Sequence, residues 1–307
     1  MQQEFAPAKV NLYLHITGRR KDGYHLLDSL VVFAGVGDRV TVSPAASLSL
    51  RLKGPFAHAL PDLQNNIVLR AANLLAKNIC RVPKVTITLE KCLPVSAGLG
   101  GGSTDAAATL RALARLWNVE QERLFSVALA LGADVPVCLY NAPSQITGIG
   151  AALQPAPALP SAWLLLVNPL RPLATASVFK AYDVDARRVY SAAKPIVDVP
   201  KNAIALAQML AVSRRNDLYN SAIALEPSIR TVLEVLTSLQ DCLLARMSGS
   251  GATCFGLFAD SAAAKAAAHN FKTSRPSWWS TAAPLLRPCN SSVMRLSSDH
   301  NAQRLGQ

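Results

Sequence analysis

The hydrophobic pattern of the chain alternates between two kinds of segment. Short runs with alternating or continuous apolar residues predict strands, and longer runs with apolar residues three and four apart predict helices. Strands are expected at 5–17, 24–35, 38–42, 48–52, 85–91, 135–139, 146–153 and 163–169, on both sides of a glycine turn within 245–256, and near 278–279. Helices are expected at 65–77, 106–117 and 121–131, from 175, and at 202–212, 216–225, 228–239 and 261–270.

A proline-rich segment at 155–160 interrupts this pattern and predicts a rigid linker. With 307 residues the chain is long enough for two packed units. We therefore expect an N-terminal domain at 1–160 and a C-terminal domain at 161–287. The polar tail at 288–307 is expected to be disordered.

The stretch at 94–105 carries the strongest chemical signal, because four glycines fall within five residues between a predicted strand and a predicted helix. Glycine allows tight turns and the close approach of a bulky anion. A helix N-terminus adds unpaired N–H groups and positive dipole charge. The stretch therefore favours a polyphosphate site. The alternative is a flexible turn with Ser103 or Thr104 as an ordinary helix cap. No Lys follows the glycines as in a Walker A loop, and Ser103 replaces the third Gly of a dinucleotide motif.

Composition narrows the function classes. The net charge of +12 fits attraction of nucleic acid or of a polyphosphate. The chain has no arginine-rich run or RNP-like motif, so no nucleic-acid partner is expected. Six scattered cysteines without a Cys-x-x-Cys pair, and five unclustered histidines, argue against a disulfide scaffold or a zinc site. No apolar run is long enough to span a membrane, and the N-terminus does not resemble a signal peptide, so we expect a cytoplasmic protein without membrane contact.

Several motifs resemble those of the GHMP kinases, a family that includes galactokinase, homoserine kinase and mevalonate kinase. They are the glycine stretch, Pro7-Ala8-Lys9-Val10-Asn11-Leu12, Gly132-Ala133-Asp134-Val135-Pro136 and Ser248-Gly249-Ser250-Gly251. The resemblance covers about residues 5–286. It implies a two-domain α+β fold: an N-terminal α/β unit like that of a ribosomal protein, with a left-handed type of crossover, and a C-terminal ferredoxin-like α+β unit.

The resemblance also implies an ATP-dependent kinase that uses Mg²⁺. Lys9 and Asp134 are the implied catalytic residues. Local sequence alone favours other roles for both, an exposed lysine near a strand start and a turn or cap aspartate. The implied ATP-binding residues are Asn66, Lys91, Pro94, Val95, Ser96, Ala97, Gly98, Leu99, Gly100, Gly101, Gly102, Ser103 and Thr104. Ser103 is the suggested Mg²⁺ ligand, and the fourth motif is implied to brace the loop. Two alternatives stay open: Asn66 as a second capping Asn beside Asn65, and Lys91 as a strand end.

The implied substrate comes from Asp22-Gly23-Tyr24-His25, which matches the family branch that handles a cytidine diphosphate compound in isoprenoid synthesis. In that branch Tyr24 stacks on the cytosine and His25 bonds its edge, while Asn11, Thr175 and Phe179 shape the pocket. The alternatives by local sequence are a buried aromatic for Tyr24, a turn histidine for His25 and a core residue for Phe179. Other GHMP kinases, a basic RNA-binding module and a non-catalytic descendant are the alternatives. We expect a monomer or weak homodimer.

Overall fold

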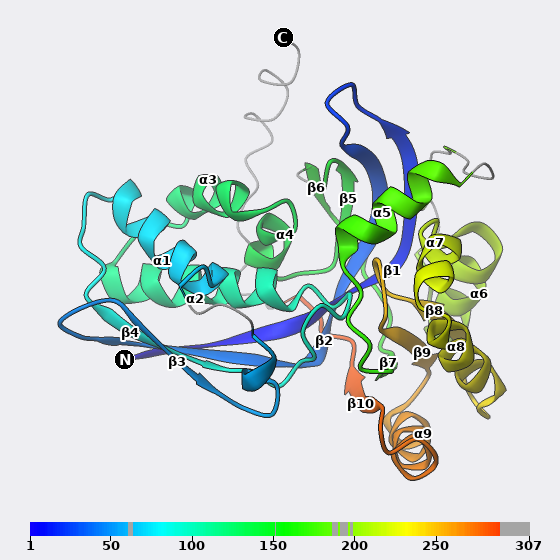
Figure 1. Ribbon diagram of the computed structural model, residues 1–307. Helices are drawn as coiled ribbons and strands as arrows, with labels where there is room; N and C mark the ends of the chain where they lie inside the picture. Colours follow the sequence, from blue (N-terminus) through cyan, green and yellow to red (C-terminus); the bar gives the residue numbers. More distant parts are fainter. Residues whose placement is uncertain (61–63, 151, 186–189, 191–195, 197–198, 289–307) are drawn as a thin grey trace.

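The computed structural model of the protein describes residues 1–60, 64–150, 152–185, 190, 196 and 199–288. Its described strands form two sheets, a six-stranded sheet from residues 2–155 and a four-stranded sheet from residues 163–284. Figure 1 shows the first sheet with its helices on one side of the molecule and the second on the other. The chain passes from one sheet to the other at the proline-rich segment, so a domain boundary near residue 160 stays our proposal.

A long antiparallel hairpin forms the centre of the first sheet. It consists of β1 (Gln2–Arg19) and β2 (His25–Pro44), and the expected strands 24–35 and 38–42 are one continuous strand. One part of β2 pairs with β4 (Val85–Glu90) and the other with β5 (Ser144–Gly148). The edges are β3 (Ser49–Lys53), which runs parallel to β4, and β6 (Ala152–Pro155).

Four helices pack against one face of this sheet: α1 (Ile67–Asn78), α2 (Gly101–Trp117), α3 (Glu122–Leu131) and α4 (Val135–Tyr140). The consecutive alanines 106–108 of α2 are fully buried, and their small side chains allow close packing. The strand expected at 135–139 was wrong, because this segment is α4. A short continuous apolar run does not distinguish a buried strand from a buried helix, and Pro136 fits a first helical turn.

The second sheet has the strand order β10-β7-β9-β8, with all neighbours antiparallel. Its strands are β7 (Trp163–Asn168), β8 (Leu244–Met247), β9 (Cys254–Phe258) and β10 (Trp279–Pro284). Between β7 and β8 lie α5 (Thr175–Val184), α6 (Ala203–Ser213), α7 (Tyr219–Leu225) and α8 (Ser228–Ser238); α9 (Ser261–Ser274) joins β9 to β10. This order, fourth-first-third-second, is the expected ferredoxin-like arrangement.

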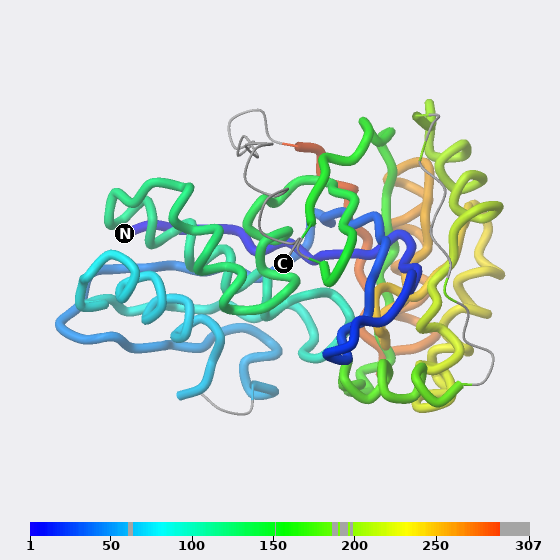
Figure 2. The backbone as a smooth tube through the Cα atoms, turned by 90° about the horizontal axis from the view of Figure 1, so that it is seen from above, coloured from blue at the N-terminus to red at the C-terminus, as the bar shows by residue number. Residues whose placement is uncertain are grey.

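The two sheets share a hydrophobic core through β1. Val10 and Leu12 of β1 belong to the same buried cluster as Leu164 and Leu166 of β7. Figure 2 shows β1 running from the first unit to the second, where the tip of the hairpin lies beside α5. The hairpin therefore carries residues from one unit to the other. None of the described helices is long and apolar enough to cross a membrane. The expected disorder of the tail concerns residues that, from 289 onward, lie outside the described part of the chain.

Candidate active site

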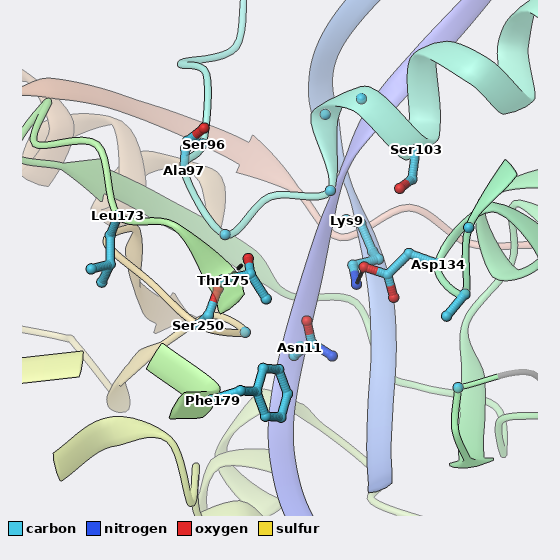
Figure 3. Close-up of a pocket in the computed structure, with 18 of the residues that line it drawn as sticks. Lys9, Asn11, Ser96, Ala97, Ser103, Asp134, Leu173, Thr175, Phe179 and Ser250 are labelled. Atoms are coloured by element: carbon cyan, nitrogen blue, oxygen red, sulfur yellow. Dashed lines mark hydrogen bonds and ion pairs between the residues drawn. The ribbon is translucent and has the colours of Figure 1, made fainter. Parts of the chain in front are cut away.

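A cavity of about 900 Å³ opens where the glycine stretch, β1, the hairpin tip and the start of α5 meet. Figure 3 shows this region, with Lys9 and Asp134 at one end and Phe179 at the other. Most of the residues expected to form a site line the cavity, although they come from segments far apart in the sequence. Leu99 and Thr104 are the exceptions.

The glycine stretch is an ordered loop between β4 and α2. Helix α2 begins at Gly101, and its cap residue Gly100 has a left-handed backbone with φ of 62°. The helix thus starts before Ser103 and Thr104, so neither is its cap. The Thr104 hydroxyl donates to the Gly101 carbonyl at 3.0 Å and is buried, whereas Ser103 points into the cavity. Ser103 is therefore the hydroxyl available to a ligand.

The Ser-Gly-Ser-Gly turn braces this loop, as the resemblance implied. The Ser248 hydroxyl donates to the Gly98 carbonyl at 3.0 Å, and the Thr253 amide donates to the Ala97 carbonyl at 3.1 Å. The turn is held in place by Asn216, whose side chain donates to the carbonyls of Met247 and Gly249. Sequence reasoning missed this role, because only the fold brings Asn216 to the turn.

Lys9 and Asp134 form an ion pair beside the loop. The Lys9 ammonium donates to Oδ2 of Asp134 at 2.7 Å, and the Lys9 side chain is 6% exposed while that of Asp134 is 44% exposed. The Lys9 amide donates to the Leu99 carbonyl at 2.9 Å, which ties β1 to the loop. Asp134 immediately precedes α4 and does not cap it with its side chain. The capping alternative for Asp134 therefore has no support, and its carboxylate faces the cavity.

Lys91 lies beneath the N-terminus of α2 in a buried ionic triad. Its ammonium pairs with Asp38, on β2, and donates to Asp105, on α2, at 2.9 Å. Burial, the largest single effect, lowers the pKa of Lys91, but attraction by Asp105 and Asp38 and the hydrogen bonds to them together outweigh it and raise the pKa. Since the Lys91 side chain is 2% exposed and its ammonium is already paired, the geometry favours a structural role for Lys91 over the expected contact with ATP.

Asp105 has fewer hydrogen bonds than Asp38 in this triad. Asp38 also accepts hydrogen bonds from the amides of Cys92 and Leu93, whereas Oδ1 of Asp105 is buried without a partner among the described residues. Burial raises the pKa of Asp105 to about 7, with Lys91 opposing the shift and Asp38 adding to it. The carboxylate at the helix start is thus turned into the protein.

Asn66, and not Asn65, caps α1. Its side-chain oxygen accepts from the Val68 amide at 2.9 Å, and Asn66 also lines the cavity. This cap uses only the carboxamide oxygen, so its NH₂ group stays available as a donor. The capping role is confirmed, and the contact with adenine stays a prediction.

The opposite end of the cavity is aromatic and polar. Asn11 donates to the Ser29 hydroxyl at 2.8 Å, and its own Oδ1 is buried without a partner among the described residues. The hydroxyls of Thr175 and Ser250 lie 2.9 Å apart (Figure 3).

Tyr24 and His25 lie at the hairpin tip beside α5. The Tyr24 ring is not buried, since the residue is 63% exposed at the cavity mouth. His25 contacts Phe179 with ring centroids 4.9 Å apart and pairs with Asp183 at 2.8 Å. Asp183 was missed, because no local motif marks it.

Comparison with known proteins gives two family matches. Residues 66–142 match the GHMP kinases N terminal domain, and residues 196–275 match the GHMP kinases C terminal domain. A protein of Paramagnetospirillum magneticum named 4-diphosphocytidyl-2-C-methyl-D-erythritol kinase is 55% identical over 92% of this chain and 97% of its own. A protein of Rhodospirillum rubrum with the same name is 52% identical over 92% of each chain.

Solved structures agree with these matches. A crystal structure of 4-(cytidine 5'-diphospho)-2C-methyl-D-erythritol kinase is 34% identical, with a TM-score of 0.74 over 92% of this chain and 98% of that chain. A crystal structure of mevalonate kinase is 11% identical, with a TM-score of 0.67 over 94% of this chain and 100% of that chain, and so shares the fold.

Proposed function

The chain belongs to the GHMP kinase family, and we propose that it transfers a phosphoryl group from ATP to the 2-hydroxyl of 4-diphosphocytidyl-2-C-methyl-D-erythritol. The products would be the 2-phosphate and ADP, as a step of the methylerythritol phosphate route to isoprenoids. The observation that carries this proposal is the cavity itself, which joins a braced glycine loop at a helix N-terminus to the Lys9–Asp134 pair. The relatives named for this kinase, at about half identity over nearly the whole chain, support the same substrate.

Phosphoryl transfer depends mainly on positioning and on stabilising the charge of the moving group. The amides of the loop and of the first turn of α2 would hold the phosphates of ATP. Asp134 would accept the proton of the attacking hydroxyl, since its carboxylate is half-exposed to the cavity. Lys9, 2.7 Å away, would orient that carboxylate and stabilise the charge that develops on the oxygen and the phosphoryl group.

The residues present fit a magnesium ion carried in with the nucleotide. Among the described residues no group of three or more His, Cys, Asp or Glu side chains could hold a metal by itself. Mg²⁺ keeps several waters and binds substrate phosphates, so one protein oxygen is enough. The Ser103 hydroxyl, at the cavity and on the first turn of α2, would supply it. The ion would neutralise phosphate charge during transfer.

The end of the cavity near Tyr24 and Phe179 fits a flat, polar ring on the molecule that accepts the phosphoryl group. An exposed Tyr24 ring at the mouth and the Phe179 ring beside His25 offer aromatic surfaces for a base. Small acceptors such as mevalonate or homoserine would leave this end unfilled. The alternatives of another GHMP kinase or a basic RNA-binding protein therefore have less support. We also propose that the protein is a monomer or a weak homodimer and that it lies in the cytoplasm.

The test is an assay of ADP release from Mg-ATP with three acceptors: 4-diphosphocytidyl-2-C-methyl-D-erythritol, mevalonate and homoserine. We expect turnover with the cytidyl compound alone, and NMR of the product should place the new phosphate on the 2-hydroxyl. The control is Asp134→Asn, which should leave ATP binding intact and lower turnover by about 10²-fold or more. Turnover with mevalonate or homoserine in place of the cytidyl compound would refute the substrate assignment.

A further inference from the structure

The tip of the β1–β2 hairpin is joined to the end of α5 by a histidine that hydrogen-bonds to an aspartate. Nε2 of His25 lies 2.8 Å from Oδ1 of Asp183, and Oδ2 of Asp183 lies 3.3 Å from Nη2 of Arg19. The His25 side chain is only 9% exposed. Figures 1 and 2 both show the hairpin tip beside α5. Asp183 therefore links the two units at the aromatic end of the cavity.

This contact determines which nitrogen of His25 carries the proton. A carboxylate can only accept a hydrogen bond, so Nε2 of His25 must be the donor toward Asp183. In a neutral imidazole the other nitrogen is then an acceptor. The protein thus holds Nδ1 of His25 in the accepting form.

That acceptor is open to a ligand. Among the described residues the His25 side chain makes no hydrogen bond besides the one to Asp183, and Nδ1 is not one of the buried atoms without a partner. His25 itself lines the cavity. Nδ1 is therefore an accepting atom that has contact with solvent in the cavity and needs a donor from whatever binds there.

We propose that Asp183 is a positioning residue that fixes the tautomer of His25 and thereby makes this end of the cavity select cytosine over uracil. This inference rests on the proposed function, because it requires that the substrate carry a cytidine diphosphate group. Cytosine carries an amino group that donates where uracil carries a carbonyl oxygen that accepts. The proposal places Nδ1 opposite position 4 of the pyrimidine, where it meets a donor in cytosine and a second acceptor in uracil. At position 3 the order is reversed, since cytosine accepts there and uracil donates. A site built to hydrogen-bond one group rejects the analogue that leaves its atoms unpaired.

The tautomer can be measured directly, without substrate. Two-bond ¹H–¹⁵N spectra of histidine-labelled protein at pH 8, where an imidazole is ordinarily neutral, distinguish the two forms. His25→Gln identifies the His25 signals by their loss. We expect the Nε2–H form in the wild type and a large Nδ1–H fraction in Asp183→Ala. An Nδ1–H form in the wild type, or an unchanged tautomer in the variant, would overturn the proposal.

Selectivity is measured with the cytidyl substrate and its uridyl analogue. We expect Asp183→Ala to lower the cytidine preference in kcat/KM by about tenfold or more, mainly through KM, which corresponds to one hydrogen bond. Glu234→Ala, which removes an exposed carboxylate from α8, should keep the wild-type preference. Asp183→Asn, which keeps the side-chain size and one acceptor oxygen, should show an intermediate preference.

A uniform loss of activity with an unchanged preference would mean that Asp183 only supports the fold, and would refute the proposal. Absence of wild-type turnover with the cytidyl compound would instead count against the proposed function. In that case the selectivity is measured as the ratio of the dissociation constants for CDP and UDP. Asp183→Ala should bring this ratio close to one.

Discussion

The ammonium of Lys9 lies 2.7 Å from a carboxylate oxygen of Asp134, although 125 positions separate the two residues in the chain. Lys9 comes from the central strand β1, and Asp134 from the short connection between α3 and α4. The buried stem of Lys9 packs against the Gly100 position, where an added Cβ would lie 3.0 Å from Lys9 Cε. Lys9, which holds the Asp134 carboxylate, therefore packs directly against the glycine loop.

Asp134→Asn should lower kcat and leave KM for both substrates nearly unchanged. The amide keeps the size of the side chain and can still accept from Lys9, but it cannot take up the substrate proton. Loss of a general base typically costs about 10²- to 10⁴-fold in rate. Steady-state kinetics with both substrates varied will separate the two constants. Wild-type turnover by Asp134→Asn would refute its role as the base.

Gly98→Ala should damage the phosphate loop specifically. Gly98 has φ of +73°, and an added Cβ would lie 2.6 Å from the Gly251 carbonyl oxygen and 2.7 Å from that of Ser248. The bracing turn would have to move, so we expect KM for ATP to rise at least about tenfold and the free energy of unfolding to fall by about 2–3 kcal/mol. Nucleotide titration and urea unfolding will measure these changes.

Gly148→Ala is the matched control for this substitution. Gly148 has a similar φ of +67°, but an added Cβ there meets nothing within 4 Å. Gly148→Ala should therefore lower the free energy of unfolding only by the cost of a left-handed backbone, about 1–2 kcal/mol, and keep the wild-type KM for ATP. Equal effects of both substitutions on ATP binding would show that the close approach to the turn is unimportant.

Lys91→Met should lower the free energy of unfolding strongly and change kcat and KM for ATP only slightly. The substitution leaves Asp38 and Asp105 buried without their shared cation. Removing one partner of a buried ion pair typically costs about 3–5 kcal/mol. Urea unfolding at pH 8 will measure the change, with the exposed Lys77→Met on α1 as control. An unchanged stability together with a large rise in KM for ATP would instead support direct contact of Lys91 with the nucleotide.

Much of this architecture is predictable from local sequence. The glycine loop, the hairpin and most helices follow from periodicity and from turn residues, because these features depend on neighbouring positions. Helix α4 was mistaken for a strand, since a six-residue apolar run fits either form once it is buried. The positions of Asn65 and Asn66 differ by one residue, which is within the uncertainty of any helix end.

The partners of the site residues are much less predictable. Asp183 reaches His25 across 158 positions, and Asn216 reaches the Gly249 carbonyl across 33. Asp105 stands beside two hydroxyls at a helix start, where no local pattern indicates a partner for its carboxylate. Only the packing of α2 against β2 turns its carboxylate inward to Lys91. Such pairings depend on the tertiary fold and leave no local pattern.

The raised pKa of Asp105 predicts a particular dependence of stability on pH. Its ordinary value of 3.8 applies to the unfolded chain, and burial raises the pKa to about 7 in the folded protein. Between these values the folded state binds the extra proton, so this group makes stability fall as the pH rises from about 4 to about 7. Asp105→Asn removes the titration and should flatten that part of the profile. Urea unfolding of the wild type and of Asp105→Asn from pH 4.5 to 8 will test this. The free energy of unfolding of the variant should increase relative to that of the wild type as the pH rises. A constant difference across this range would show that Asp105 stays ionised beside Lys91 throughout.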